Sequence, residues 1–355
     1  MMPRTWSTQT LGSVSDLAWG DTSKTKAQYV AEGFQAFSAT GPDGYLPTFD
    51  YDKEGVVVSA IGAQCGKTWL AKGKWSCIKN TIRIFGTPGI CDTKFLYYVT
   101  LSRNIFTPRG SAQPFISQGD ARNIQIKVPP LEEQLKISEV LGSIDDLITA
   151  NESQIEYLDQ LAMSYFLKKW DGVSTVRIDA LGEVLMGQSP AGSTLNESNN
   201  GMVFYQGVRD FGDRYPSRRV FCTSPTRQAL EGDILIAVRA PVGDTNVAIE
   251  STAIGRGIAS LRAKLPAIAL RSLRAAENTW APYQDTGTVF SSITGPDLRG
   301  AKVPYVSNEE LEALLSRLDK LHHALFVENT ELAKTRDELL PLLMSGALNV
   351  KDAAA

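Results

Sequence analysis

The residues whose spacing most suggests chemistry are Gly62 to Thr68, which follow a β-branched run and resemble a phosphate-binding loop. Such a loop needs four residues between its glycines, so that backbone amides can surround a phosphate while the following lysine reaches it. Here three residues separate Gly62 from Gly66, and Ile61 stands where the first glycine should be. The residues from Lys72 onward also do not read as the helix that the loop requires. The segment therefore predicts a turn, with nucleotide binding as the weaker alternative.

No other group of residues predicts catalysis. His322 and His323 are adjacent on a helical pattern and diverge by about 100°, so a shared zinc ion is not expected, and we place both on a solvated helix surface. The four cysteines show no Cys-x-x-Cys spacing. We find no motif of an amino-methyltransferase, no glycine-rich cofactor loop after a strand and no acidic pair of a nuclease. We therefore expect a chain that does no chemistry alone and uses no cofactor and no metal.

The elements around these residues form a repeat. The tripeptide Lys-Val-Pro at 127–129 closes one block and introduces a long apolar-periodic segment, and Lys-Val-Pro at 302–304 does the same 175 residues later. Leu-Gly at 11–12 and at 181–182 opens the two blocks with an offset of 170 residues. Offsets drift when surface loops change length while the framework stays constant. The pattern indicates a duplicated domain.

Each block predicts a mixed domain of strands and helices. The β-branched runs 56–58 and 234–236 stand among glycine and proline turns, and a helical stretch follows near 93–104 or 267–280. We therefore predict an α/β (α+β) fold made of two copies. Its parts are a first domain at 1–128, a long helix at 129–171, a second domain at 172–303, a long helix at 304–350 and a tail at 351–355.

Both periodic segments predict coiled-coil helices of about 39 residues, which would be about 58 Å long. Acidic residues in the first turns favour helix N-termini, and Gly172 and Gly346 are natural stops. The apolar seam, meaning the stripe that faces the other helix, follows a spacing of four and three residues. The first seam runs Ile137, Leu141, Ile144, Ile148, Asn151, Ile155, Leu158, Ala162, Tyr165, and the second runs Leu311, Leu314, Leu318, Leu321, Leu325, Glu328, Leu332, Thr335, Leu339, Leu342.

Polar residues interrupt both seams near their middle. A two-fold relation between the copies would run the helices antiparallel and bring Asn151 close to Glu328 and Asn329. A buried polar pair there would fix the register of the coil at some cost in stability. The alternative is that Glu328 turns to solvent and that Asn329 or nothing meets Asn151. Pro341 should kink or end the second helix near Leu340.

Charge is divided unevenly along the chain, although the whole carries only −3. Residues 3–128 hold a net charge of +5 and residues 172–303 one of +2, whereas residues 129–171 hold −6 and residues 304–355 hold −4. A polyanion would therefore meet the two blocks and avoid the periodic segments. We see no charged-then-apolar leader and no apolar run of membrane-spanning length, so we expect a cytoplasmic protein with no membrane partner.

Several motifs resemble the specificity subunits of type I restriction-modification systems. The stretch 232–246, Gly-Asp-Ile-Leu-Ile-Ala-Val-Arg-Ala-Pro-Val-Gly-Asp-Thr-Asn, looks like a target-recognition domain of that family. Residues 128–134 and the helix after them look like its central conserved region, and residues 339–346 look like its distal one. In the first block, Ser-Ala-Thr-Gly at 38–41 and Ser-Ala-Ile-Gly-Ala at 59–63 are similar to the weaker motifs of the other recognition domain.

The resemblance implies two pseudo-two-fold-related target-recognition domains, each reading one half of a split site in double-stranded DNA, joined by an antiparallel two-helix coiled coil. It also implies partners. Two modification subunits would dock on the chain and methylate adenine, using S-adenosylmethionine, and restriction subunits that hydrolyse ATP and cut DNA would join them. The chain itself would be the recognition subunit and no enzyme.

Base reading needs side chains with planar or forked donors and acceptors, and hydroxyls or amides hold phosphates. Polar residues of these types in glycine-containing loops are our candidates for DNA contacts. They are Lys67, Arg83, Ser111 and Gln113 in the first block, and Gln188, Tyr205, Gln206, Arg209, Arg239 and Arg256 in the second. Each arginine could instead form a structural ion pair or face solvent, and Arg239 and Arg256 could brace the turn around Pro241.

Two rival interpretations come from other classes of protein. One is a coiled-coil scaffold whose blocks bind protein, which the acidic coil and the small basic excess of the second block would suit. The other is a nucleotide hydrolase built on the loop at Gly62, which the glycine spacing argues against. Salt-sensitive binding to duplex DNA discriminates the leading interpretation from the scaffold, and absence of ATP binding would exclude the hydrolase.

Overall fold

The structure is a computed structural model that describes residues 6–101, 105–110, 112–283 and 292–348. It divides into two compact units, each with its own core. Unit 1 comprises Met1–Ala150 and Glu328–Ala355, and unit 2 comprises Asn151–Val327. Each unit therefore combines one block of the sequence with one segment of each long helix.

Unit 1 is built on two small sheets, with strand orders β2-β9-β6-β7 and β4-β3-β8-β5, and a separate pair of β1 with β10. The strands are β1 (Ser7–Thr10), β2 (Ser15–Trp19), β3 (Phe34–Ser38), β4 (Gly41–Leu46), β5 (Tyr51–Asp52), β6 (Gly55–Ser59), β7 (Thr68–Ala71), β8 (Lys74–Cys77), β9 (Thr81–Gly86) and β10 (Gln125–Val128). The short helices are α1 (Leu11–Val14), η1 (Lys26–Gln28), α2 (Thr93–Leu101) and α3 (Gln118–Arg122). Strand β6 is buried throughout, because it lies between β9 and β7 in its sheet and beneath α2.

Unit 2 repeats this plan with strand orders β12-β20-β17-β18 and β13-β15-β14-β19-β16, and a pair of β11 with β21. Its strands are β11 (Thr175–Arg177), β12 (Gly182–Met186), β13 (Leu195–Asn196), β14 (Met202–Tyr205), β15 (Phe221–Cys222), β16 (Gln228–Ala229), β17 (Ile234–Ala237), β18 (Thr245–Val247), β19 (Thr252–Ile254), β20 (Ile258–Ala263) and β21 (Lys302–Pro304). Its short helices are α5 (Ile178–Leu181), η3 (Gly192–Thr194), η4 (Val208–Asp210), α6 (Pro266–Arg274), α7 (Glu277–Trp280), η5 (Ala281–Tyr283) and α8 (Gly295–Gly300).

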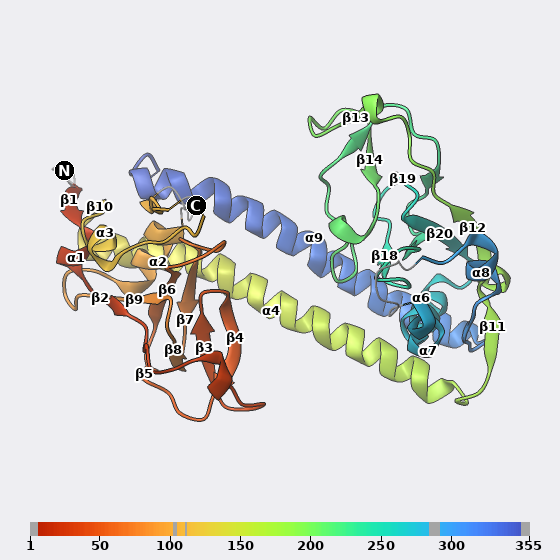
Figure 1. Cartoon of the computed structure of the whole chain (residues 1–355), viewed down its shortest axis with the longest axis horizontal. Coiled ribbons are helices and arrows are strands. Elements are labelled where there is room, and N and C mark those ends of the chain that lie inside the picture. The colour runs from red at the N-terminus through yellow and green to blue at the C-terminus, as the bar shows by residue number, and fades with distance from the viewer. Residues whose placement is uncertain (1–5, 102–104, 111, 284–291, 349–355) are drawn as a thin grey trace. The chain divides into compact units, whose positions relative to one another are not determined.

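Apart from the additional edge strand β13 of unit 2, the two units share one topology, which confirms the duplication. Both units combine strands with helices, as predicted (Figure 1). In unit 1, β3 pairs antiparallel with β4 and parallel with β8. In unit 2, β14 pairs antiparallel with β15 and parallel with β19. The central sheets correspond strand for strand, so that β2, β9, β6 and β7 have β12, β20, β17 and β18 as counterparts. Because the strands correspond, the hydrogen-bond register identifies which residues of unit 1 are equivalent to which residues of unit 2.

The two long helices are also confirmed, as α4 (Leu131–Lys169) and α9 (Glu309–Ser345). Asn308 caps α9, because its Oδ1 accepts a hydrogen bond from the backbone amide of Leu311 (2.8 Å). Helix α9 does not end at Pro341 but continues to Ser345. The ring nitrogen of Pro341 has no hydrogen to donate to the carbonyl of Asp337, so the helix loses one intrahelical hydrogen bond there.

Within each unit the two helix segments run antiparallel. In unit 1, Arg336 Nη1 donates to Asp145 Oδ1 (3.0 Å), and Asn329 Nδ2 donates to the carbonyl of Ile148 (3.2 Å). Residues later in α4 therefore contact residues earlier in α9. In unit 2, Phe166 shares a buried cluster with Leu311 and Leu315, whereas Asp159, two turns earlier on α4, lies beside His322.

The seam of α9 differs from the predicted one. Leu321 and Leu342 are 49% and 45% exposed, whereas the next residues along, His322 and Leu343, are 2% and 0% exposed. The seam therefore passes one position later at these turns. The prediction that His322 is solvated is wrong. The Asp159 carboxylate and the ring of Tyr215 lie beside the imidazole, so His322 is buried next to a polar and an aromatic neighbour. His323 is exposed, as expected.

The polar residues chosen for the coil register have different environments. Asn151 is buried at 2% exposure, Glu328 is exposed, and Asn329 is half-buried with its hydrogen bond to Ile148. The exposure of Glu328 favours the alternative in which this carboxylate turns to solvent. That Asn151 sets the register stays a prediction.

Among the described residues, no helix combines the length and the apolar character that crossing a membrane requires.

The corrected seam makes a prediction about stability. Leu315→Ala should lower the free energy of unfolding by about 2–5 kcal/mol, because it leaves a cavity in a fully buried cluster. Leu321→Ala, on the same helix, should change it by less than about 0.5 kcal/mol, because that side chain already faces solvent. Urea unfolding of the two variants measures the difference. Equal losses of unfolding free energy in the two variants would instead support the seam that the sequence predicted.

Candidate nucleic-acid interface

Four strands of unit 2 lead into turns that are hydrogen-bonded to one another. Gln188 N donates to Ile254 O (3.0 Å), Gly255 N to Tyr205 O (2.8 Å) and Val238 N to Gly257 O (3.0 Å). The turns that follow β12, β14, β17 and β19 therefore meet at one edge. We call residues 187–189, 206–209, 238–240 and 255–257 the second reading edge.

Glycines permit this close approach of the turns. A Cβ on Gly255 would lie 2.4 Å from Gln206 Oε1, and one on Gly257 would lie 2.4 Å from the carbonyl oxygen of Gln206. A larger residue at 257 would meet the backbone of the neighbouring turn, and one at 255 would displace the Gln206 side chain. The glycines around Arg256 in the sequence are thus explained by packing between turns.

Polar side chains of the second reading edge lie together on its exposed face. The Ser189 hydroxyl donates to Gln206 Oε1 (2.9 Å), and Arg256 Nε donates to the same hydroxyl (3.4 Å). Gln188, Gln206 and Arg256 are exposed. The structure therefore brings these three predicted residues together around Ser189, which the sequence analysis did not single out.

The three arginines of this edge lack the carboxylate partners that Arg218 and Arg262 of unit 2 have. Arg218 pairs with Glu250 (2.6 Å), and Arg262 pairs with Asp233 (3.0 Å). Arg209, Arg239 and Arg256 are exposed, and within the described part of the chain no salt bridge reaches them. Unpaired guanidinium groups beside exposed amides are suited to phosphates and to the acceptor atoms of guanine.

Unit 1 has the same edge, defined by the same hydrogen bonds. Asp21 N donates to Cys77 O (2.8 Å), Ile78 N to Phe37 O (2.9 Å) and Ala60 N to Asn80 O (3.0 Å). By register, Lys79 takes the place of Arg256 and Asn80 that of Gly257, in a left-handed conformation (φ 70°) that asparagine tolerates. Residues 20–22, 38–40, 60–62 and 78–80 form the first reading edge.

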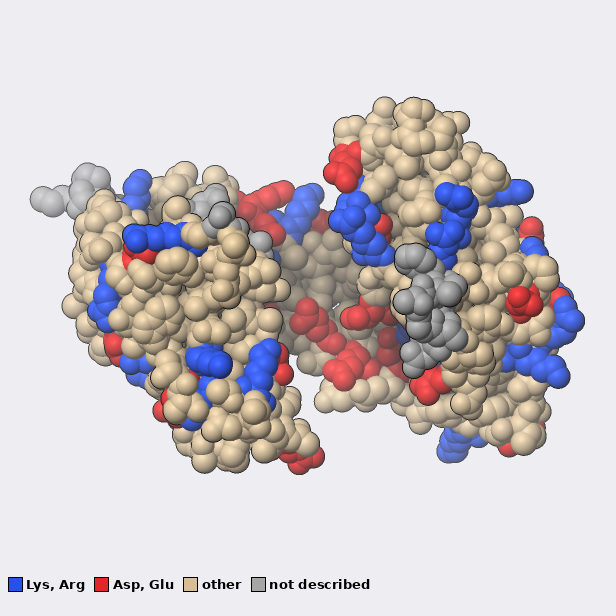
Figure 2. Space-filling view, viewed as in Figure 1, with Lys and Arg blue, Asp and Glu red and all other residues tan. Residues whose placement is uncertain are grey.

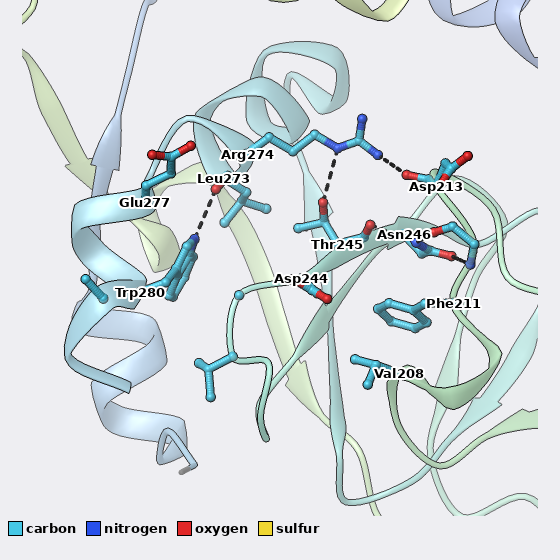
Figure 3. Close-up of a pocket in the computed structure, with 14 residues that line it drawn as sticks. Val208, Phe211, Asp213, Asp244, Thr245, Asn246, Leu273, Arg274, Glu277 and Trp280 are labelled. Atoms are coloured by element: carbon cyan, nitrogen blue, oxygen red, sulfur yellow. Dashed lines mark hydrogen bonds between the residues drawn. The ribbon is translucent and has the colours of Figure 1, made fainter. Parts of the chain in front are cut away.

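A hollow of about 900 Å³ lies next to the second reading edge, between η4, β18 and α7 (Figure 3). Val208, Phe211 and Trp280 form its apolar walls, and Asp244 projects from the turn before β18. Burial raises the pKa of Asp244. The carboxylates of Asp213, Asp244 and Glu277 would repel phosphates, and the Arg274 guanidinium is already bound to Thr245 Oγ1 (3.3 Å) and the Asp213 carbonyl (2.7 Å). We therefore do not count the hollow as a DNA-binding part of the second reading edge, with which it shares only Val208.

Comparisons with known proteins give the family. Residues 3–159 match the sequence model of the family described as type I restriction modification DNA specificity domain. A protein of Methanocaldococcus jannaschii, named as a candidate type I restriction enzyme MjaX specificity subunit, is 30% identical over 279 residues, which cover 70% of this chain and 66% of that protein. This chain belongs to the family of type I specificity subunits.

Two further relatives extend over more of the chain. The type I restriction enzyme MjaVIII specificity subunit of the same organism is 23% identical over 340 residues, covering 82% of this chain and 78% of that protein. A crystal structure of the type I restriction-modification system S subunit from M. genitalium covers 97% of both chains with a TM-score of 0.67 and 19% identity. The second likeness shows that the fold is that of a specificity subunit over its length.

The candidate residues of the first domain of this specificity subunit do not gather as those of the second do. Lys67 is half-buried with its Nζ 5.5 Å from the Trp69 ring centroid, and Gln113 is exposed on a segment that borders the Gly62 turn. Arg83 belongs to β9, where it pairs with Asp16 (2.8 Å) and lies over the ring of Phe85 (5.1 Å). The structural interpretation of Arg83 is therefore favoured. Ser111 lies outside the described residues.

The structure argues against the predicted contact of Tyr205 with DNA. Its side chain is 1% exposed and packs among Val203, Leu235 and Ile258 in a core cluster, because the last residue of β14 points inward. The sequence analysis also missed Lys79 and Asn80. Only the hydrogen-bond register, which shows that they match Arg256 and Gly257, identifies them.

The structure also argues against a phosphate-binding loop at Gly62 to Thr68. Strand β7 begins at Thr68, where a phosphate-binding loop requires a helix, so Gly62 to Lys67 form the turn between β6 and β7. Among the described residues, no group of three or more His, Cys, Asp or Glu side chains could hold a metal ion.

The correction of Tyr205 can be tested by removing its hydroxyl. That oxygen is buried and has no hydrogen-bond partner among the described residues. Tyr205→Phe should therefore leave DNA affinity unchanged and raise the free energy of unfolding by about 1 kcal/mol, since an unsatisfied buried polar group is removed. Titration and urea unfolding measure the two effects. A clear loss of affinity would return Tyr205 to the reading edge.

Proposed function

We propose that this chain is the DNA-recognition subunit of a type I restriction-modification complex and reads a bipartite site in double-stranded DNA, one half per unit. The observation that carries the proposal is the reading edge, which occurs once in each unit with the same hydrogen-bond register. In each copy an exposed basic residue, Lys79 or Arg256, occupies the same turn. We take residues 1–128 and 172–303 as the recognition domains, 129–171 and 304–350 as the spacer helices, and 351–355 as a tail.

The distribution of charge supports this assignment. Acidic side chains gather over α4 on the face seen in Figure 2, in agreement with the net charge of −6 for residues 129–171. Such a helix repels phosphates, so DNA is left to the basic blocks. The acidic helices are then available for proteins, and we propose that two modification subunits dock there, with restriction subunits joining them in the cytoplasm.

The proposed complex divides labour between its parts. Methylation of adenine and cleavage of DNA belong to the partner subunits, and this chain supplies the choice of site without catalysis or a cofactor of its own. The rival in which the chain is a protein-binding scaffold predicts no preference for any DNA sequence.

The second half-site is tested by Arg209→Ala. The full chain, assembled with its modification subunits, is used to select duplexes from a random-sequence pool at one salt concentration. Loss of the unpaired Arg209 guanidinium should weaken recognition by about 1–3 kcal/mol and relax the preference at one position of one half-site.

Arg218→Ala is the matched control, because Arg218 is exposed in the same unit but pairs with Glu250 away from the edge. It should leave both halves of the selected site unchanged. If Arg209→Ala selects the wild-type motif with wild-type affinity, Arg209 is not part of the interface.

The first half-site is tested by Lys79→Ala. A lysine that neutralises one phosphate should, when removed, lower the slope of log affinity against log salt concentration by about 1, without relaxing any base preference. Lys74→Ala is the control, since Lys74 begins β8 whereas Lys79 follows its end. Equal slopes for wild type and Lys79→Ala would mean that the first edge does not face DNA.

A further inference from the structure

A buried cluster of charges joins the recognition domain of unit 2 to both long helices. Arg214, on the loop after η4, is 3% exposed. Its Nη1 donates to Asp159 Oδ1 on α4 (3.0 Å), and its Nη2 donates to Asp319 Oδ1 on α9. One guanidinium group thus binds two helices at once, through the fixed angle between its two nitrogens.

Other cations complete the cluster. Arg271 of α6, also 3% exposed, binds both oxygens of Asp319, and Arg274 Nη1 lies 3.4 Å from Asp159 Oδ2. Burial alone would raise the pKa of Asp159, but the neighbouring His322 imidazole (Nε2–Oδ2 3.5 Å) and the charges of Arg214 and Arg274 lower it to about 2. The Asp159 carboxylate is therefore ionised at neutral pH, and its attraction to Arg214 is fully present.

The loop that carries Arg214 begins at the second reading edge. Arg209 lies five residues before Arg214, and the chain between them is fixed to β18. Asn246, 1% exposed, accepts from the Gly212 amide (3.1 Å) and donates to the Gly212 carbonyl (2.8 Å). Val247 N donates to Arg214 O (2.8 Å). Movement of Arg214 would consequently be transmitted to the turn that holds Arg209.

Unit 1 uses a carboxylate at the corresponding place on its helix. Asp145 in Ile-Asp-Asp-Leu (144–147) matches Asp319 in Leu-Asp-Lys-Leu (318–321). Asp145 accepts from Tyr98 Oη of α2 (2.7 Å), as Asp319 accepts from Arg271 of α6, the counterpart of α2. The carboxylate recurs in both units although the residue that binds it differs.

We propose that Arg214 is a positioning residue, which fixes the second reading edge on the helix pair and thereby restricts the gap allowed between the two half-sites. The inference rests on the function proposed above. A buried ion pair adds little stability compared with apolar packing, but its directed hydrogen bonds specify one orientation. A gap longer by one base pair displaces a half-site by about 3.4 Å and rotates it by about 35°, so a fixed domain accepts one gap only.

The test is single-molecule sequencing of adenine methylation in cells that express the full chain with its modification subunits. For Arg214→Ala, the share of methylated sites whose gap differs by one base pair from the wild-type gap should rise about tenfold, equivalent to about 1.4 kcal/mol of lost discrimination. The bases of both halves should stay the same. Asp159→Asn and Asp319→Asn each remove the charge from one of the two ion pairs of Arg214 at nearly constant side-chain volume. Both should also raise the share of methylated sites with a changed gap.

Arg218→Ala controls for the loss of an arginine from the same unit, because its partner Glu250 is not on a long helix, and it should keep the single gap. Arg214→Lys should restore the wild-type gap only in part, since an ammonium group lacks the fork. If the asparagine variants fold and keep a single gap, the inference is overturned and the cluster is only structural. If the wild-type chain yields no bipartite motif, the proposed function fails, and the inference fails with it.

Discussion

In each unit, a carboxylate on a long helix binds the domain that packs against that helix, and the geometry of the reading edges depends on this contact. Asp319 receives Arg214 and Arg271, and Asp145 receives Tyr98 and Arg336. These groups are largely withdrawn from water, where a charge that lost its partner would be costly. Each domain is therefore restricted to orientations that satisfy its carboxylate, and its reading edge is oriented with it.

The reading edges follow from a second constraint, which is the geometry of short turns at the ends of neighbouring strands. Backbone hydrogen bonds between turns satisfy amides that the strands no longer pair, and glycines at 255 and 257 allow the turns to approach. Because the framework of each edge is made by the backbone, exposed side chains such as Gln188 and Arg256 can vary without disturbing it. A recognition protein benefits from such an arrangement, since its specificity can change while its fold stays the same.

The sequence was sufficient for features that depend on periodicity and repetition. The Lys-Val-Pro repeat predicts the duplication, and the apolar alternation predicts both long helices, because each signal extends over many residues. It failed where a neighbour distant in sequence decides the outcome. His322 is buried because Asp159 and Tyr215 lie beside it, and the position of the α9 seam shifts accordingly.

The same reasoning explains the mixed result at the candidate site. Gln188, Gln206 and Arg256 lie in glycine-rich turns, so their residue types and local context predict exposure correctly. Tyr205 stands in the same motif but ends a strand whose side chains point into a core. Lys79 and Asn80 share no sequence motif with Arg256 and Gly257, and they correspond only through hydrogen-bond register.

The most direct test of the central claim is single-molecule sequencing of adenine methylation in cells that express this chain with its cognate modification subunit, compared with cells that lack the chain. The account predicts a methylated motif of two short defined halves around a gap of fixed length, which disappears when the chain is absent. A motif without two halves, or the same methylation with and without the chain while the modification subunit is active, would contradict it.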